Sequence, residues 1–153
     1  MPREKLKIVV PPADAGRDRY MLDEQVGFLL RVAMQRHTSI FTARMIEQLT
    51  QTQFAALAKL YEVGPCSQNQ LGRLIFLDAA TIKGVIDRLA IRGFVSALSD
   101  PNDRRRRALT LTERGRKVIE AATFIAAEIT AATLSPLTEE ERHAVVRLLK
   151  KLG

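Results

Sequence analysis

The stretch "SQNQLGRLIFLDAATIKGVIDRLAIRGFVSALSDPNDRRRRALTLTERG", residues 67–115, decides the fold, because the spacing of its apolar residues changes part-way along. The first part has the three- and four-residue steps of helices and predicts one helix over 67–75 and another over 79–92. The turn "FLD" between them has the length that a helix–turn–helix needs. Gly93 is expected to end the second helix.

The part after Gly93 alternates with a period of two and predicts a β-hairpin, or wing. Its strands are expected over 94–99 and 107–112, joined by a turn over 100–106. Four consecutive arginines, 104–107, stand where this turn meets the second strand. Like charges side by side repel each other, so the run is costly unless a negative partner lies opposite. DNA is such a partner, because an arginine at the tip of a wing can enter the minor groove.

The expected DNA contacts come from both helices and from the wing. The second helix of a helix–turn–helix enters the major groove, and its N-terminal residues meet base edges. Small residues there allow a close approach, and a threonine or lysine can contact bases or phosphates. In the wing, an aspartate can orient a neighbouring guanidinium through a bidentate pair. The expected contacts are Ser67, Gln68 and Asn69; Ala79, Ala80, Thr81, Lys83, Gly84 and Arg88; and Asp103, Arg104, Arg105 and Arg106.

Two plainer interpretations stay open at this point. On the DNA-binding interpretation Arg88 and Arg92 can bind phosphates, but the helix over 79–92 also has the pattern of an ordinary amphipathic surface helix. The other interpretation of the arginine run is a solvated group of charges on an exposed turn.

Long helices are expected on both sides of this stretch. Apolar residues at three- and four-residue steps predict an amphipathic helix over 22–48, and a shorter helix is expected to begin at Thr52. Another long helix is expected from Thr112 to the break at Pro136, and a last one follows Thr138. The predicted fold class is mainly α with a small β-wing, a winged helix–turn–helix.

The chain is expected to divide into three parts. Residues 1–21 show no period and predict a flexible arm; 22–48 and 116–153 supply dimerisation helices; and 49–115 form the DNA-binding lobe. A homodimer is expected because the first and last helices carry apolar stripes too extensive for the middle of the chain to cover. Two-fold symmetry then predicts a pseudo-palindromic operator in double-stranded DNA.

Composition limits the class of protein. The 153 residues suffice for one domain with a real core; 46% of them are hydrophobic, and the net charge is +7. That charge suits a polyanionic partner, either nucleic acid or an acidic membrane surface. One cysteine and no apolar run of membrane-spanning length predict a soluble cytoplasmic protein that binds no membrane.

The sequence carries no signal for catalysis, a cofactor or a metal. It has no nucleophile motif and no glycine-rich phosphate loop, and His37, His143 and Cys66 lack the spacing of metal ligands. Cys66 precedes a helix N-terminus, which would lower the pKa of a thiol, but a small packing residue is the favoured interpretation. No enzyme is expected.

The region over 49–115 resembles the MarR family of bacterial transcription regulators. The spacing from Asp-Arg-Leu through glycine and Asp-x-x-Asp-Arg-Arg to Leu-Thr is the specific part of the resemblance. The matching residues are Leu49-Thr50, Gln53-Phe54, Leu57, Leu71, Thr81, Asp87-Arg88-Leu89, Gly93, Asp100, Asp103-Arg104-Arg105, Leu111-Thr112 and Gly115.

The resemblance implies a homodimer whose terminal helices interlock at the two-fold axis. It implies that 78–88 is the recognition helix, that Arg105 enters the minor groove and that Asp103 orients it. Most members are repressors released from DNA by a small ligand, often a phenolic or aromatic acid, bound between the dimer helices and the DNA-binding lobe. This chain departs from the family at Asp78-Ala79-Ala80, where a serine or proline is common, so its target sequence can differ.

The first helix carries the candidate effector residues. Arg36 and His37 fall near its apolar stripe, where an arginine can hold a carboxylate in fork geometry and a histidine can tune the pH response. The alternative is that Arg36 and Arg44 form ion pairs across the dimer and that His37 is a hydrogen-bonded core residue. The family's redox-sensing branch has its reactive cysteine in the first helix, which here has none.

The prediction is therefore a ligand-responsive repressor. Its alternative is a sequence-tolerant architectural DNA-binding protein without ligand control. An activator or a redox switch on the same fold is a weaker third possibility.

Overall fold

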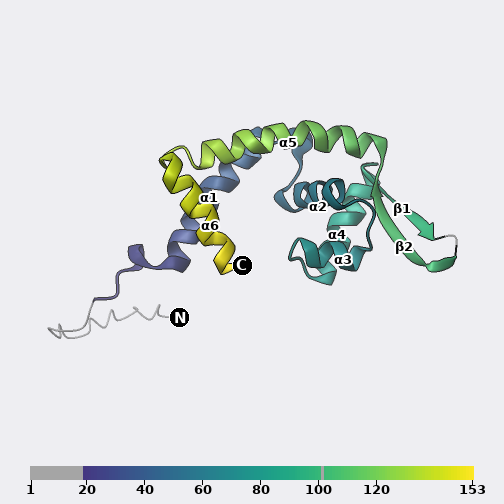
Figure 1. The fold of residues 1–153 in the computed structure, drawn as a ribbon, viewed down its shortest axis with the longest axis horizontal. Coiled ribbons are helices and arrows are strands. Elements are labelled where there is room, and N and C mark those ends of the chain that lie inside the picture. The colour runs from purple at the N-terminus through teal and green to yellow at the C-terminus, as the bar shows by residue number, and fades with distance from the viewer. Residues whose placement is uncertain (1–18, 101) are drawn as a thin grey trace, which may run out of the picture.

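The computed structural model describes residues 19–100 and 102–153, which form helices and one two-stranded sheet (Figure 1). The side chains of Asp100 and of residues 103–106 lie outside the described part, as does nearly all of the expected N-terminal arm. The order of helices and strands confirms the predicted fold class. The elements are η1 (Leu22–Glu24), α1 (Val26–Arg44), η2 (Ile46–Gln48), α2 (Gln51–Val63), α3 (Gln68–Leu74), α4 (Ala79–Ile91), β1 (Val95–Asp100), β2 (Asp103–Leu111), α5 (Glu113–Thr133) and α6 (Glu139–Leu152).

Side-chain caps determine where the central helices begin. Thr50 caps α2 through a reciprocal pair of bonds with Gln53, so this helix starts one residue before the expected Thr52. The Ser67 hydroxyl accepts the backbone N–H of Gln70, and an Asp78 carboxylate oxygen accepts that of Thr81 at 2.7 Å. Each cap satisfies a backbone donor that the helix itself leaves free.

We call α2, α3, α4, β1 and β2 the central lobe. Its hydrophobic core contains one face of α4 and packs against the N-terminal half of α5. Phe94, at the base of the wing, is fully buried in this core. Gly93 has a φ of 75° and ends α4, as predicted. Gly115 packs against the backbone of Phe94 so closely that a Cβ there would lie 1.9 Å from the Phe94 carbonyl oxygen. The buried side chains of α4 are Ile82, Val85, Ile86 and Leu89.

The wing differs from its prediction at the arginine run. β1 and β2 pair antiparallel, but β2 begins at Asp103, so the expected turn over 100–106 is wrong and residues 104–107 lie in a strand. Ser99 pairs with Arg107 and the next residue pairs with Asp103, so Arg104, Arg105 and Arg106 fall in a register shift.

The expected helix over 22–48 is broken at its C-terminal end. α1 stops at Arg44, and the linker to α2 contains two consecutive non-glycine residues with positive φ, Glu47 at 56° and Gln48 at 50°. This conformation is uncommon for such residues and reverses the chain so that α2 can return towards α5. The apolar spacing continues through the linker, which explains why the sequence predicted one helix.

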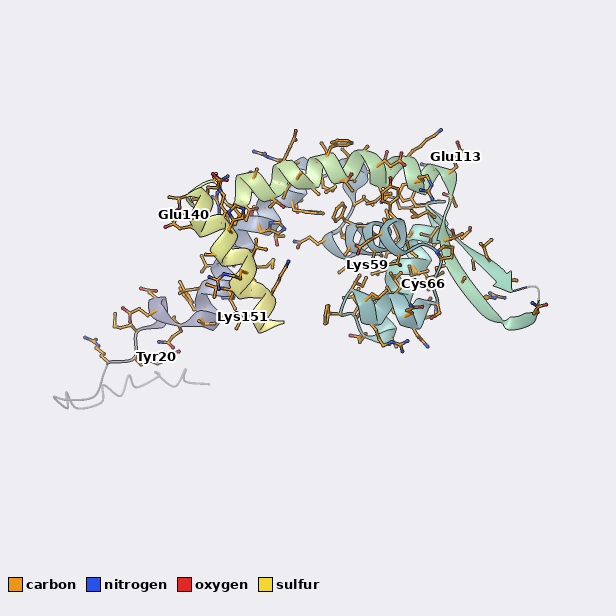
Figure 2. All side chains as sticks on the ribbon, in the orientation of Figure 1. Tyr20, Lys59, Cys66, Glu113, Glu140 and Lys151 are labelled. Carbon is orange, nitrogen blue, oxygen red and sulfur yellow. The ribbon has the colours of Figure 1, made fainter. Side chains whose placement is uncertain are left out.

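α5 joins the central lobe to the other long helices (Figure 1). Its N-terminal half packs on α2, and it also packs along α1. We call α1, α6 and the C-terminal half of α5 the helical extension. α6 has no buried residue; Glu140 lies near its start and Lys151 near its end, as the helix dipole favours (Figure 2).

The described residues were also searched for a membrane span. Within 19–100 and 102–153, no helix is long and apolar enough to cross a bilayer.

Candidate nucleic-acid interface

The N-terminal part of α4 presents an exposed surface of small residues. Ala79, Ala80 and Thr81 are exposed, while the opposite face of the same helix is anchored in the core. Asp78 fixes the start of the helix, and its hydrogen bonds with the Thr81 backbone and side chain hold the pKa of the carboxyl below its ordinary value. The first turn is therefore rigid and able to approach another molecule closely.

Lys83 and Arg88 lie on the exposed side of α4. The Lys83 ammonium pairs with the Asp87 carboxylate at 2.7 Å, and both side chains are more than half exposed. A solvent-exposed pair four residues apart on a helix contributes only about 0.3–0.5 kcal/mol. Exchanging this carboxylate for a phosphate therefore costs little.

The start of α3 and the middle of α4 complete this part of the expected site. Ser67 and Asn69 are exposed, and Gln68 and Gly84 are half-buried. Gly84 has open space beside it apart from the Arg88 guanidinium, whose nearer nitrogen would lie 3.8 Å from an added Cβ. These residues have the exposure that the predicted DNA contacts need.

Arg92, a candidate phosphate contact from the sequence, binds the linker between α1 and α2 in the folded chain. Its guanidinium donates to the Glu47 carbonyl oxygen and lies 3.5 Å from the Glu47 carboxylate. It also stacks 4.6 Å from the centre of the Phe94 ring. Arg92 thus holds the linker between α1 and α2 against the end of α4. Residues 45–49 contain neither glycine nor proline, so no local signal predicted this linker.

For four of the expected wing contacts the structure describes the backbone alone. They are Asp103, Arg104, Arg105 and Arg106. All four lie in β2, and their side chains are outside the described part. The assignment of Arg105 to the minor groove and of Asp103 to its orientation stays a prediction.

Arg36 and His37 both bind the C-terminal end of α5. The Arg36 guanidinium donates to the Ala132 carbonyl at 2.9 Å and the Thr133 carbonyl at 3.3 Å, and His37 Nδ1 lies 2.9 Å from Thr133 Oγ1. A cation at the last carbonyls of a helix is favourable because those oxygens carry partial negative charge. Their role in ligand binding stays a prediction, and the structure adds a tie between α1 and α5 that the sequence did not predict.

Cys66 is a core residue, as the favoured interpretation expected (Figure 2). It connects α2 to α3 and forms an isolated β-bridge with Leu109, exchanging backbone hydrogen bonds of 3.2 and 2.8 Å. Burial raises the pKa of its thiol, so the lowering expected from the nearby helix N-terminus is overcome.

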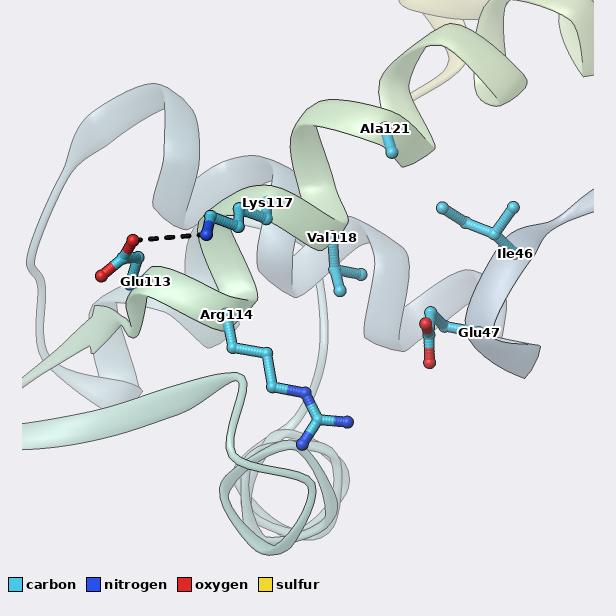
Figure 3. A pocket seen from close by; sticks show the side chains of 7 residues that line it. All are labelled: Ile46, Glu47, Glu113, Arg114, Lys117, Val118 and Ala121. Atoms are coloured by element: carbon cyan, nitrogen blue, oxygen red, sulfur yellow. Dashed lines mark ion pairs between the residues drawn. The ribbon is translucent and has the colours of Figure 1, made fainter.

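Two pockets lie beside the linker between α1 and α2. One, of about 720 Å³, is formed by α1 and the start of α2, and its lining includes Phe41, Thr42 and Met45 but no charged side chain. The other, of about 610 Å³, lies between the linker and α5 and is lined by charges of both signs, including Glu47 and the ion pair of Glu113 with Lys117 (Figure 3). Two carboxylates make the second pocket the poorer host for an acid.

The described residues contain no group of three or more His, Cys, Asp or Glu side chains arranged to hold a metal ion.

Comparison with known proteins identifies the family. A model of the MarR family matches residues 49–106. The transcriptional repressor NicR of Pseudomonas putida is 40% identical over 144 residues, 92% of this chain and 91% of NicR. The chain belongs to the MarR family. It is accordingly a transcription regulator of winged helix–turn–helix type and not an enzyme.

Two solved MarR-type structures resemble it closely. A probable transcriptional regulator from Pseudomonas aeruginosa has a TM-score of 0.84 and 47% identity, covering 87% of this chain and 100% of that one. BpsR of Bordetella bronchiseptica, whose DNA binding is regulated by 6-hydroxynicotinic acid, has a TM-score of 0.81 and 41% identity, covering 87% of this chain and 96% of BpsR.

Proposed function

We propose that this MarR-family regulator is a homodimeric repressor that leaves a pseudo-palindromic operator when a small aromatic acid binds. The observation that carries the DNA-binding part is the surface of α4, where Ala79, Ala80 and Thr81 are exposed on a helix whose other face is buried. Base readout requires such a rigidly held, accessible helix end. The repressor NicR supports the direction of the regulation. The bacterial cytoplasm, where the chromosome lies, is the proposed compartment.

The proposed dimer surface is the helical extension. Its helices expose large apolar side chains that no described part of the chain covers, and a second copy of the same helices would bury them. We accordingly assign 22–48 and 116–153 to dimerisation and 49–115 to DNA binding. The exposed apolar side chains are Val26, Leu29, Leu30, Val32 and Met34 on α1 and Val146, Leu148, Leu149 and Leu152 on α6.

The proposed effector site joins Arg36 and His37 to the larger uncharged pocket. Phe41 lines that pocket, and its ring centre lies 6.2 Å from that of His37. An aromatic acid would place its ring against Phe41 and its carboxylate towards Arg36. A carboxylate is a stronger acceptor than the carbonyls of Ala132 and Thr133, so binding would loosen α1 from the end of α5. α5 also packs on α2, which gives the change a route to the central lobe.

The DNA-binding part is tested by selecting duplexes from a random pool with the full-length protein. Fluorescence anisotropy then measures affinity for the selected duplex and for a scrambled one. We expect a preference of roughly a thousandfold or more and one dimer per selected site. Equal affinity for both would contradict the repressor and leave a sequence-tolerant DNA-binding protein.

The effector part is tested with 6-hydroxynicotinic acid and a panel of other aromatic carboxylates. Calorimetry measures their binding to the protein, and anisotropy measures release from the selected duplex. Arg36→Ala should abolish binding of an active acid and, because it also removes the hydrogen bonds between α1 and the end of α5, should weaken DNA binding in the absence of any acid. Arg44→Ala, which removes another exposed arginine of α1, is the matched control and should keep both. Loss of the response in both variants, or in neither, would contradict the role of Arg36.

A further inference from the structure

Phe76, in the turn between α3 and α4, is an aromatic residue that the fold does not use. Its side chain is 87% exposed. Its φ is 57°, in the left-handed region where a bulky side chain is strained. The folded chain therefore holds a strained backbone and an exposed phenyl ring at one position. Backbone strain of this kind often accompanies a functional contact.

The turn itself explains the left-handed backbone but not the ring. The Leu77 N–H donates to the Gly72 carbonyl at 2.9 Å, which closes the end of α3. Gly72 is buried, and a Cβ there would lie 3.2 Å from both Ile82 and the Leu77 carbonyl, so the turn has no room to relax. A glycine or asparagine at position 76 would adopt this conformation with less strain. The exposed ring of Phe76 is therefore available for a contact outside the chain, and the strain makes such a contact worth testing.

The position of the ring indicates DNA. Phe76 lies two residues before Asp78, the cap of α4, and three before Ala79, a separation of at most about 10 Å. The N-terminal residues of α4 are those proposed to enter the major groove, which is about 12 Å wide. A side chain on the turn at this end of the helix therefore lies at the edge of the same groove. Phenylalanine is among the side chains that make apolar contact with the thymine methyl group.

We propose that Phe76 is a DNA contact of the recognition turn, packing on a thymine methyl or a deoxyribose at the edge of the major groove. This inference rests on the proposed DNA-binding function. It adds an apolar contact to a site whose other expected contacts are polar or small. The contact selects thymine at one position of each half-site if the methyl is the partner, and it is independent of sequence if the sugar is.

A protein partner fits the surroundings of Phe76 less well. The exposed apolar side chain nearest in the chain is Leu74, and the other exposed neighbours, Arg73, Asp78 and Ala79, are charged or small. Protein interfaces need a contiguous patch of several hundred Å². Ile91, 86% exposed, lies at the other end of α4, about 20 Å away along a 13-residue helix.

The test compares Phe76→Asn with Ile91→Asn in the full-length protein. Asparagine tolerates the left-handed conformation, so Phe76→Asn should raise the midpoint of thermal unfolding while lowering affinity for the selected duplex roughly tenfold. Ile91→Asn removes an equally exposed apolar side chain from the far end of α4 and should leave the affinity unchanged. Phe76→Gly, measured in the same way, gives a second variant without backbone strain.

A scan of the duplex with deoxyuridine in place of each thymine separates the two DNA partners. Loss of affinity at one position in the wild type, and no further loss there in Phe76→Asn, identifies the thymine methyl. Equal weakening of Phe76→Asn on selected and scrambled duplexes identifies the sugar. Unchanged DNA affinity in both Phe76 variants would overturn the proposal, and a simultaneous change in self-association would indicate a protein contact instead. A wild type that binds no DNA would instead refute the proposed function itself.

Discussion

The central lobe buries more of its large apolar side chains than the helical extension does, although Phe76 and Ile91 are exposed in the lobe and Phe41 and Ile129 are buried in the extension. Leu57, Leu71 and Leu89 are fully buried in the lobe, whereas Leu149 on α6 is 47% exposed. Burying a leucine side chain contributes roughly 2 kcal/mol to the free energy of folding. The lobe gains this stabilisation from contacts within the chain, whereas the exposed leucines of the extension do not contribute it. The lobe thus forms a hydrophobic core within one chain, whereas the extension exposes apolar side chains that a second copy of the chain would bury. Changes in the lobe should therefore act on folding, and changes in the extension on association.

The largest expected effect comes from adding one methyl group to the central lobe, and the same addition in the helical extension is its matched comparison. A Cβ at Gly115 would lie 1.9 Å from the Phe94 carbonyl oxygen, so Gly115→Ala must displace the base of the wing from α5. We expect a loss of about 4 kcal/mol in the free energy of unfolding, at the upper end for single substitutions. Urea denaturation followed by circular dichroism measures it.

The matched substitution in the extension is Gly27→Ala on α1. A Cβ at Gly27 meets no atom within 4 Å, so alanine should stabilise the helix by about 0.5–1 kcal/mol. A loss of stability at Gly27 would show that a partner backbone approaches α1 there. A small effect at Gly115 would show that the lobe is less rigid than the comparison requires.

The second prediction concerns association. Leu149→Asp places a charge in the apolar stripe of α6, and an unpaired charge in a closed interface costs about 3–5 kcal/mol. The dimer dissociation constant should therefore rise more than a hundredfold while the unfolding of the lobe is unchanged. Sedimentation velocity at several concentrations measures the shift. Leu98→Asp on β1 is the control, because Leu98 is 52% exposed but lies on the wing, and its variant should remain a dimer.

The sequence predicted the lobe better than it predicted the connections around it. Caps and stop signals at Ser67, Asp78 and Gly93 act over three or four residues, so local reasoning placed α3 and α4 well. The end of α1 depends on Arg92, 45 residues from the Glu47 carbonyl that it binds. No local pattern encodes such a contact.

The candidate site likewise contains residues that a local sequence pattern predicts and residues that only the fold brings together. The exposed side of α4 follows from its helical period, which fixes Ile82 and Leu89 inside and leaves Thr81 and Lys83 outside. The hydrogen bonds of Arg36 with the end of α5 join residues almost a hundred positions apart and needed the fold. Phe76 lies in the turn that the sequence predicted, but the sequence does not distinguish it from its neighbours. Its positive φ and its exposed side chain are known only from the structure.

A third prediction compares two helix caps. Thr112 Oγ1 accepts the Gly115 N–H at 3.0 Å and donates to the Gly93 carbonyl at 2.6 Å, whereas Thr138 caps the exposed start of α6. Thr112→Ala should cost about 2 kcal/mol of unfolding free energy, and Thr138→Ala about 1 kcal/mol or less. Urea denaturation measures both. Thr138→Ala should also weaken the dimer; equal effects on folding from both variants would remove the distinction between the two regions.

The smallest expected effect is a pH dependence of the free energy of unfolding that originates from the thiol of Cys66. Burial raises the pKa of this thiol in the folded chain, so the folded state holds its proton at a pH where the unfolded state has lost it. The contribution to stability is therefore full below the unfolded pKa, about 8.5, and declines as the pH rises towards the folded value. Urea denaturation between pH 7 and about pH 10 should show this decline, and Cys66→Ala should remove it.

The same thiol can be compared with one placed in the extension. At pH 8, Cys66 should react slowly with a disulfide reagent in the native protein and rapidly in urea, because attack requires an accessible thiolate. Ser39→Cys in a Cys66→Ala background puts a thiol of similar size on the exposed side of α1, and it should react rapidly without urea. Fast reaction of Cys66 in the native protein, with loss of DNA binding, would make the lobe a redox sensor. Slow reaction would exclude thiol oxidation as the signal, because Cys66 is the single cysteine of the chain, and it would favour the proposed small ligand as the input.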